Sequence, residues 1–242
     1  MRKRTAAAVA GVLGVVIAQA AGIAAAQGWR PPTESQRCPS KWGANDQRGA
    51  ANHMKPETVL RAAKLIRTGE VIELAHMLNA PSSNSPARVF SMVTKRSAQA
   101  PGVNQRGGNE EIVTTELGQI GTQFDAFPHQ MIASRMYNCI KLEDVETRNG
   151  FSKLGVENVG MLFTRGVLID VAALKGVEML GDNYEITVDD LQQALARQKL
   201  ALQPGDAVII HTGWGKLWGK DSARYTRSNP GIGVAAAEWL AK

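Results

Sequence analysis

The sequence has little net charge, few cysteines and, after its first 26 residues, no apolar run long enough to span a bilayer. Its 242 residues carry a formal net charge of +6, and three of these charges belong to the N-terminal cluster Arg2-Lys3-Arg4, which leaves about +3 for the rest. So small an excess does not favour nucleic acid or an anionic membrane surface as a partner. With 44% hydrophobic and 21% charged residues, the composition is typical of a globular protein, and the chain is long enough for one large domain.

Residues 1–26 are typical of a secretory signal peptide. The basic cluster is followed by an uncharged stretch, "TAAAVAGVLGVVIAQAAGIAAA", which ends in small residues. A membrane anchor is the alternative, since the stretch is about long enough to span. Its richness in Ala and Gly and its A-x-A end favour cleavage after Ala26. We therefore expect residues 27–242 to be a periplasmic or secreted protein, without stable membrane association after cleavage.

Cys38 and Cys139 are the two cysteines of the chain. Export permits a disulfide between them. Two buried free thiols are the alternative, because the sequence gives no measure of how far apart the two residues lie.

Strand and helix patterns alternate along residues 27–242 without internal repeats or a clear linker, which predicts one mixed α/β domain. Helices are predicted over 56–69 and 186–198, and strands over 71–78, 88–95, 166–171 and a run ending at His211. Residues 111–122 are rich in strand-forming residues. The polar segments 79–87 and 96–110 are predicted loops, of a kind often found at the mouth of a site.

The two predicted helices have sequence signals at their ends. The first has Pro56 in its first turn and Gly69 as its stop, with Val59, Ala63 and Ile66 on the predicted buried face. The second has Thr187 as its N-cap, acidic residues in its first turn, and Val188, Leu191 and Leu195 facing inward.

Residues 121–131, "GTQFDAFPHQM", place an acid and an imidazole four residues apart. Because Pro128 disfavours helix at Phe127, we expect Asp125 and His129 to lie on a strand end and a turn, with both side chains facing one cavity. A carboxylate can hold a divalent metal, and an imidazole can bind metal or transfer a proton. A hydrogen-bonded Asp–His pair in a structural turn is the alternative reading of this spacing.

Several segments, in order, resemble the cyclase family, which includes bacterial kynurenine formamidase and isatin hydrolase. The similarity begins with "KWGANDQRGAANHMKPETVLRAAKLIRTGEVIELAHML" and continues through "GTQFDAFPH", "RGVLIDVAALKG", "ITVDDLQQAL", "PGDAVIIHTGWGKLW" and "NPGIGVAAAEWLA". The resemblance implies an α/β fold of the swivelling β/β/α type and a metal-dependent hydrolase that opens an amide or related acyl bond in a small-molecule substrate. It also implies a homo-oligomer and a divalent metal, Mn²⁺ or Zn²⁺.

The family signature, H-x-G-T-H-x-D-x-x-x-H, aligns with "QIGTQFDAFPH" in this chain. Asp125 matches the metal-binding acid and His129 the acid/base histidine. Gln119 and Gln123 stand where relatives have two histidine ligands. An amide oxygen is a weak neutral donor, so this replacement lowers the expected zinc affinity and favours harder cations. We predict that Asp125 and Gln123 hold the metal and that His129 is catalytic. A metal-free, non-catalytic binding protein is the alternative.

The resemblance predicts a second departure at the carboxyl terminus. Relatives continue beyond "AEWLAK" with further strands and with a later His and Glu at the metal site. We therefore expect residues 27–242 to form a C-terminally incomplete domain.

The remaining histidines have less specific surroundings. His76 and His211 lie in predicted strands, where either a site residue or a hydrogen-bonded structural residue is expected, and His53 is expected to be structural or exposed. Asp170, flanked by apolar residues, needs a partner. Trp214 and Trp218 either line a pocket or pack within the fold.

Overall fold

The computed structural model describes residues 30–78, 88–97 and 103–242. The predicted signal peptide, the predicted loop 79–87 and part of the predicted loop 96–110 lie outside these ranges. Within them, no helix is both long enough and apolar enough to cross a membrane.

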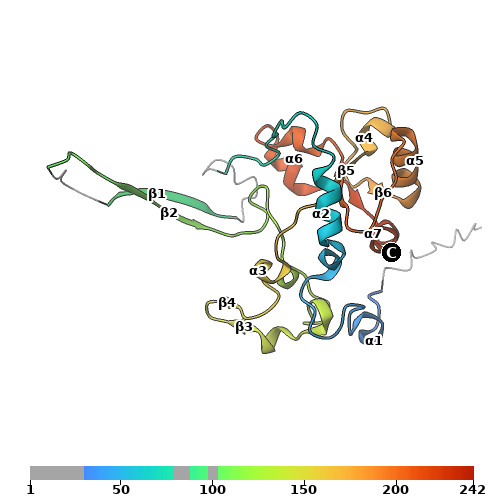
Figure 1. The fold of residues 1–242 in the computed structure, drawn as a ribbon, viewed down its shortest axis with the longest axis horizontal. Helices are drawn as coiled ribbons and strands as arrows, with labels where there is room; N and C mark the ends of the chain where they lie inside the picture. The colour runs from blue at the N-terminus through green and yellow to red at the C-terminus, as the bar shows by residue number, and fades with distance from the viewer. Residues whose placement is uncertain (1–29, 79–87, 98–102) are drawn as a thin grey trace, which may run out of the picture.

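The described residues form a single mixed α/β domain built from short elements, as the sequence predicts (Figure 1). The α-helices are α1 (Glu34–Arg37), α2 (Pro56–Ala63), α3 (Val156–Val159), α4 (Val171–Leu174), α5 (Val188–Gln198), α6 (Ser222–Arg227) and α7 (Val234–Ala241). The strands are β1 (Phe90–Arg96), β2 (Asn109–Thr115), β3 (Glu146–Thr147), β4 (Gly150–Phe151), β5 (Gly166–Asp170), β6 (Glu185–Ile186), β7 (Ala207–His211) and β8 (Gly231–Ile232). Short 3-10 helices are η1 (Gly49–His53), η3 (Phe127–His129), η4 (Tyr137–Cys139), η5 (Leu142–Asp144) and η6 (Trp214–Leu217).

The carboxyl-terminal half is an α/β layer around the parallel pair β5–β7. The register runs from Gly166 opposite Ala207 to Asp170 opposite His211, and α4, β6 and α5 form the crossover. Leu168 is 47% exposed, so β5 is buried on one face only. The inward face packs into the larger core, whose buried members include Val167, Ile169, Val171, Leu180, Ile186, Leu191, Ala194 and Leu195.

Helix α5 confirms the predicted amphipathic helix and its N-cap. The Thr187 hydroxyl accepts the N–H of Asp190 at 3.2 Å, and the Asp190 carboxylate accepts the N–H of Thr187 at 3.0 Å. This capping box satisfies two otherwise free N–H groups. Leu191 and Leu195 are 0% and 7% exposed, and Val188 is partly buried, as predicted.

A second part of the fold joins residues 38–53 to residues 127–154. Cys38 and Cys139 form a disulfide with Cα atoms 5.8 Å apart, which settles the alternative that the sequence left open. The Asn138 side chain accepts the N–H of Ser40 at 2.8 Å and donates to the carbonyl of Gly43 at 2.8 Å. A smaller core lies beside these contacts, formed by Met136, Val145 and Leu154 with Phe127, Tyr137, Ile140 and Leu142 against it.

Strands β1 and β2 form an antiparallel hairpin that extends away from the rest of the molecule (Figure 1). Strand β1 confirms the strand predicted over 88–95, shifted slightly along the chain. The strand-forming pattern of 111–122 is only partly realised, because β2 ends at Thr115 and the residues after it form bends.

The strand predicted over 71–78 is wrong. These residues have no assigned strand, and Val71, Ile72 and Leu74 are 93%, 69% and 78% exposed. A mostly apolar segment gives a strand only where another strand is available to pair with it. No strand within the described ranges pairs with this segment.

The first helix is shorter than predicted and buries a different face. Helix α2 ends at Ala63, its buried residues are Thr58 and Ala62, and Ile66 lies beyond its end at 65% exposure. Thr58 fixes this rotation, because its hydroxyl donates to the carbonyl of His53 at 3.2 Å and its side chain packs near Gly205.

Candidate functional site

The motif residues Asp125 and His129 lie on an irregular loop and the short helix that follows it. Strand β2 ends well before Asp125, and His129 is the last residue of η3. The predicted strand end at this site is therefore wrong. The turn is helical, because Pro128 occupies an early position of η3, where its missing N–H would have had no partner inside the helix.

The loop brings the acid and the histidine within ion-pair distance, but Asp125 lines the cavity described below and His129 is not among its lining residues, so the expectation that both face one cavity is met only by Asp125. His129 Nε2 lies 3.8 Å from Asp125 Oδ2, and the two side chains are 32% and 39% exposed. The distance is that of an ion pair rather than a hydrogen bond. Both groups are reachable from solvent, so a water molecule or a small ligand can meet them together.

Gln123 faces the same carboxylate through its amide nitrogen. Its Nε2 lies 3.3 Å from Asp125 Oδ1 and 3.5 Å from Oδ2. Its Oε1 accepts the backbone N–H of Gln119. Because a backbone N–H can only donate, this bond fixes the orientation of the amide and points its N–H groups at Asp125.

Gly118 is a site residue that the motif alone did not reveal. A Cβ atom at this position would lie 3.3 Å from His129 Cε1 and 3.8 Å from Asp125 Oδ1. A side chain there would press on both groups. The following residue, Gln119, has φ +63°, a left-handed conformation that is uncommon outside glycine. The only sequence signal was the glycine beside the aligned Gln119.

Contacts from the smaller core hold η3 in place. Phe127 stacks on Tyr137 with ring centroids 4.3 Å apart, and a Cβ on Gly49, which has φ +53°, would lie 2.7 Å from Phe127 Cζ. Asp46 accepts hydrogen bonds from the Tyr137 hydroxyl at 2.7 Å and from Asn52 at 2.6 Å.

This support includes a carboxylate that stays ionised. Burial alone would raise the pKa of Asp46, but hydrogen bonds from Asn52, Tyr137 and the N–H of Gly49 bring it below its ordinary value. Burial is the main reason that the pKa of Tyr137 is raised, and its hydrogen bond to Asp46 adds to this. The phenol therefore remains a hydrogen-bond donor to Asp46 at neutral pH.

His76 lies next to this loop, on the exposed segment 71–78. Its backbone N–H donates to Thr122 Oγ1 at 2.9 Å, and its ring stacks on Trp218 at 4.5 Å. Trp214, in contrast, is 5% exposed and donates to the carbonyl of Tyr225 at 3.3 Å, as a packing residue would. Of the two tryptophans, Trp218 is thus the one that borders the loop.

Asp170 and His211 form a separate pair at the carboxyl ends of β5 and β7. His211 Nδ1 lies 2.9 Å from Asp170 Oδ1, and the side chains are 47% and 31% exposed. Hydrogen bonds from the N–H of Ala173 and then from His211 lower the pKa of Asp170. Because Asp170 also caps α4, the structure gives the partner that the sequence required for it.

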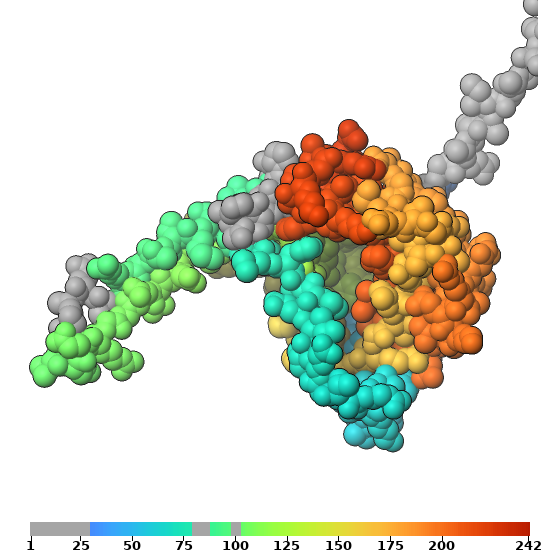
Figure 2. Space-filling view, turned by 90° about the horizontal axis from the view of Figure 1, so that it is seen from above, coloured from blue at the N-terminus to red at the C-terminus, as the bar shows by residue number. Residues whose placement is uncertain are grey.

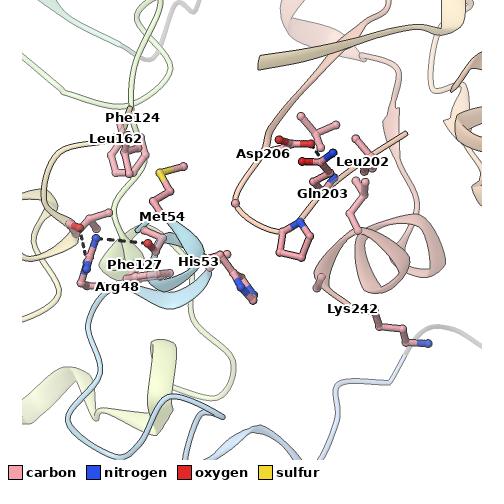
Figure 3. Close-up of a pocket in the computed structure, with 18 of the residues that line it drawn as sticks. Arg48, His53, Met54, Phe124, Phe127, Leu162, Leu202, Gln203, Asp206 and Lys242 are labelled. Carbon is pink, nitrogen blue, oxygen red and sulfur yellow. Dashed lines mark hydrogen bonds between the residues drawn. The ribbon is translucent and has the colours of Figure 1, made fainter. Parts of the chain in front are cut away.

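A cavity of about 750 Å³ lies between the loop 124–127 and the α/β layer. One wall carries Met54, Phe124 and Leu162, and the facing wall carries Leu202 and Gln203 (Figure 3). Asp125 and His53 also line it, and the lining is mostly apolar. Seen from another direction, the molecule is hollowed between the segment around α2 and the α/β layer (Figure 2).

Comparisons with known proteins identify the family. Residues 72–242 match the family model named Cyclase. The chain belongs to this Cyclase family. A crystal structure described as a novel cyclase is 32% identical, superposes with a TM-score of 0.73, and is matched over 83% of this chain and 71% of that one. No curated protein matches the chain.

The family resemblance implies a divalent metal at Asp125, and the donor set of this chain falls short of a zinc site. Gln123 presents N–H groups to Asp125, and a cation needs lone pairs. Among residues 30–78, 88–97 and 103–242, no three His, Cys, Asp or Glu side chains come together as metal ligands. Structural and catalytic Zn²⁺ sites take at least three protein ligands, so the described residues do not complete one.

The arrangement supports proton transfer by His129. The imidazole is accessible, and the Asp125 carboxylate lies 3.8 Å from its Nε2.

Proposed function

We propose that this protein is an exported Cyclase-family hydrolase that cleaves an amide or related acyl bond in a small molecule, in the manner of kynurenine formamidase. The observation that carries this proposal is the placement of Asp125 and His129 together, 3.8 Å apart, with Asp125 on the wall of the 750 Å³ cavity. Membership of the Cyclase family supports it.

The proposed roles follow from these contacts. His129 accepts a proton from water as the water oxygen attacks the carbonyl carbon, and then donates that proton to the leaving nitrogen as the C–N bond breaks. Asp125 stabilises the protonated imidazole by charge, since their nearest atoms are 3.8 Å apart. Gln123 holds Asp125 in place through its amide N–H groups.

Replacement of His129 with Ala tests these roles. Hydrolysis of a formylated aryl amine is followed by absorbance, and kcat is expected to fall about 10² to 10⁴-fold, the usual contribution of a positioned acid/base. His211→Ala is the matched control, because His211 is also exposed and paired with an aspartate. Equal rates for His129→Ala and wild type, at equal urea midpoints, would remove His129 from the mechanism.

We also propose that Asp125 and Gln123 hold Mn²⁺ or Zn²⁺ only weakly. Binding through Gln123 requires its amide to flip, so that the oxygen leaves the Gln119 N–H and replaces the amide nitrogen beside the Asp125 carboxylate. Elemental analysis of protein purified without chelator, before and after dialysis, measures this. One metal ion per chain that survives dialysis would overturn weak binding.

A second candidate function is a metal-free, non-catalytic binding protein. The observation that favours it is the Gln123 amide, which already supplies positive dipoles to Asp125 where a cation would lie. The two functions separate in one experiment: the hydrolase turns over formanilide, and the binding protein retains the same compound unchanged.

Export is proposed from the sequence of residues 1–26 and is supported by the Cys38–Cys139 disulfide. Disulfides persist mainly in oxidising compartments such as the periplasm or the outside of the cell. Fractionation of cells expressing the tagged chain, with mass determination of the mature N-terminus, tests cleavage after Ala26. Retention of the full N-terminus in the cytoplasm would contradict export.

Homo-oligomerisation is proposed through reciprocal exchange of the β1–β2 hairpin between two copies. Apolar pairs lie on both faces of the hairpin, Met92 opposite Val113 and Val93 opposite Ile112, and all four side chains are exposed. An isolated two-stranded hairpin is marginally stable in water, so a covering partner would stabilise it. Each face is about 24 Å by 10 Å. The two faces of one arm together cover about 480 Å². Each partner would bury this area on its own arm and a similar area where it covers the other arm, roughly 900 Å² in all, which is close to a standard interface.

Light scattering tests this assembly. The variant Val93→Lys places a charge on one face of the hairpin and is expected to yield monomers. Leu168→Lys, at similar exposure on β5, is the control and is expected to leave the assembly intact. A wild-type chain that is monomeric at 100 μM would refute the proposal.

A further inference from the structure

The cavity beside Asp125 is larger than a single-ring substrate requires. A cavity of about 150 Å³ is enough to bind benzene, whereas this one has a volume of about 750 Å³, roughly five times as much. Its volume is in the range of pockets that hold ligands of drug size. A one-ring amide would leave most of it to water or empty.

The walls are apolar and come from both halves of the fold. Met54, Phe124 and Leu162 contribute from the side of the candidate site, and Leu202 from the α/β layer (Figure 3). Val208 of β7 and Leu240 of α7 also line the cavity. Leu162 is 44% exposed despite its place in this wall. Exposed apolar surface that faces a concave space favours an apolar ligand, which removes that surface from water.

Two charged side chains on the walls are already engaged by the protein, and Lys242, which also lines the cavity, is exposed. Arg48 donates to the carbonyl of Val159 at 2.9 Å and to that of Ala51 at 3.4 Å. The Asp206 carboxylate is 2% exposed and is held by Arg165 and by Arg61 at 3.8 Å. Neither group is available to orient a second polar end of a ligand without losing its own partner.

Asp125 is held less fully than Arg48 and Asp206. Its carboxylate is 39% exposed and contacts the Gln123 amide and the His129 ring. A ligand is therefore recognised by one polar group near Asp125 and by a long apolar body in the rest of the cavity. An anionic head group is disfavoured there by charge.

We infer that the cavity binds the aliphatic chain of a neutral acyl compound, such as a medium- or long-chain amide, with the acyl carbon toward Asp125 and His129. This inference rests on the proposed function for the choice of an acyl head group. The chain itself is selected by the volume and the apolar walls. Within the proposed amide hydrolysis, the inferred substrates are therefore amides that carry an aliphatic chain.

Calorimetry with a homologous series of primary alkyl amides, from butanamide to decanamide, tests the inference. Each buried methylene contributes a transfer free energy that corresponds to about a fourfold lower Kd. The expected result is therefore a Kd that falls about fourfold with each added methylene, with benzamide binding more weakly than decanamide. A Kd that does not change with chain length would overturn the inference.

Two leucines of similar exposure provide a matched pair of variants. Leu162→Trp fills the cavity from an exposed wall position, and Leu168→Trp adds the same bulk on β5 outside the cavity; the two leucines are 44% and 47% exposed. Leu162→Trp is expected to weaken decanamide binding at least tenfold with little effect on butanamide, and Leu168→Trp to bind both as wild type does. Equal decanamide affinity in the two variants would refute the site.

The binding series is repeated in His129→Ala, which separates this inference from the proposed function. A chain-length dependence that persists there supports the cavity even if no hydrolysis is found in the wild type. Turnover of formanilide without any chain-length dependence supports the hydrolase and refutes the acyl-chain site.

Discussion

Replacing Gln123 with His is expected to create a zinc site from the present geometry. Zn²⁺ binds nitrogen and oxygen ligands at about 2.0 to 2.1 Å in tetrahedral sites, which places neighbouring ligand atoms roughly 3.3 Å apart. The Gln123 amide nitrogen lies 3.3 Å from Asp125 Oδ1, and His129 Nε2 lies 3.8 Å from Asp125 Oδ2. An imidazole at position 123 would therefore add a third donor beside Asp125 and His129, where the amide now offers N–H groups.

The magnitude follows from the change in coordination. Partners that only orient a metal ligand are worth about 10 to 100-fold in metal affinity. A direct ligand should reach at least the upper end of this range, so the Zn²⁺ Kd of Gln123→His is expected to fall at least about 100-fold. This corresponds to about 2.8 kcal/mol.

Competition with a chromogenic zinc chelator measures this affinity, and Gln192→His serves as the control. Gln192 is exposed on α5, so its replacement adds a histidine without adding a ligand to Asp125. If Gln123→His binds zinc no better than Gln192→His, then Asp125 and His129 are not positioned to share a metal ion. The inference that Gln123 in place of a histidine weakens metal binding at this site would then be wrong.

Three further predictions concern the site and its support. Gly118→Val should lower kcat about 100-fold at an unchanged urea midpoint. A Cβ at position 118 would already lie 3.3 Å from His129 Cε1, so the larger valine side chain would displace His129. An unchanged kcat would refute this packing. Thr187→Ala should lower the free energy of unfolding by about 1 kcal/mol in urea titrations, because the cap of α5 loses its acceptor, and a wild-type value would contradict the cap. Burial alone would raise the pKa of Asp206, but the hydrogen bond from Arg165 and other contacts bring the pKa below its ordinary value of 3.8. The ionised Asp206 therefore contributes its full stabilisation above pH 3.8, and this stabilisation is lost as the pH falls through the lowered pKa. Asp206→Asn should therefore be destabilised by about 3 to 5 kcal/mol at pH 7 and lose less further stability than wild type between pH 5 and pH 2, whereas parallel pH profiles would exclude Asp206 as the cause.

The sequence correctly predicted two kinds of element: a helix that carries its own cap and apolar face, and strands that pair with another apolar strand. Helix α5 has its own cap and apolar face, and β5 and β7 are apolar runs that pair with each other. Residues 71–78 are also mostly apolar, but no described strand pairs with them. A strand requires a partner elsewhere in the chain, and the segment itself does not encode whether one exists.

The candidate site shows the same division. The four-residue spacing of Asp125 and His129 was sufficient to predict that they meet, because the chain between them is short. The orientation of Gln123 was not predictable, because it depends on a bond from the backbone of Gln119. The stacking of His76 on Trp218 joins residues far apart in the sequence, and such contacts are decided by the tertiary fold.

The disulfide between Cys38 and Cys139 has a topological consequence for the site. Its sequence separation of 101 residues encloses the hairpin, Asp125 and His129 in one covalently closed loop. A protease that cuts the exposed hairpin once therefore opens this ring without releasing a fragment. The cut chain keeps its mass, plus one water, until it is reduced. A protein built in this way keeps both sides of its candidate site attached after one cut in the exposed hairpin.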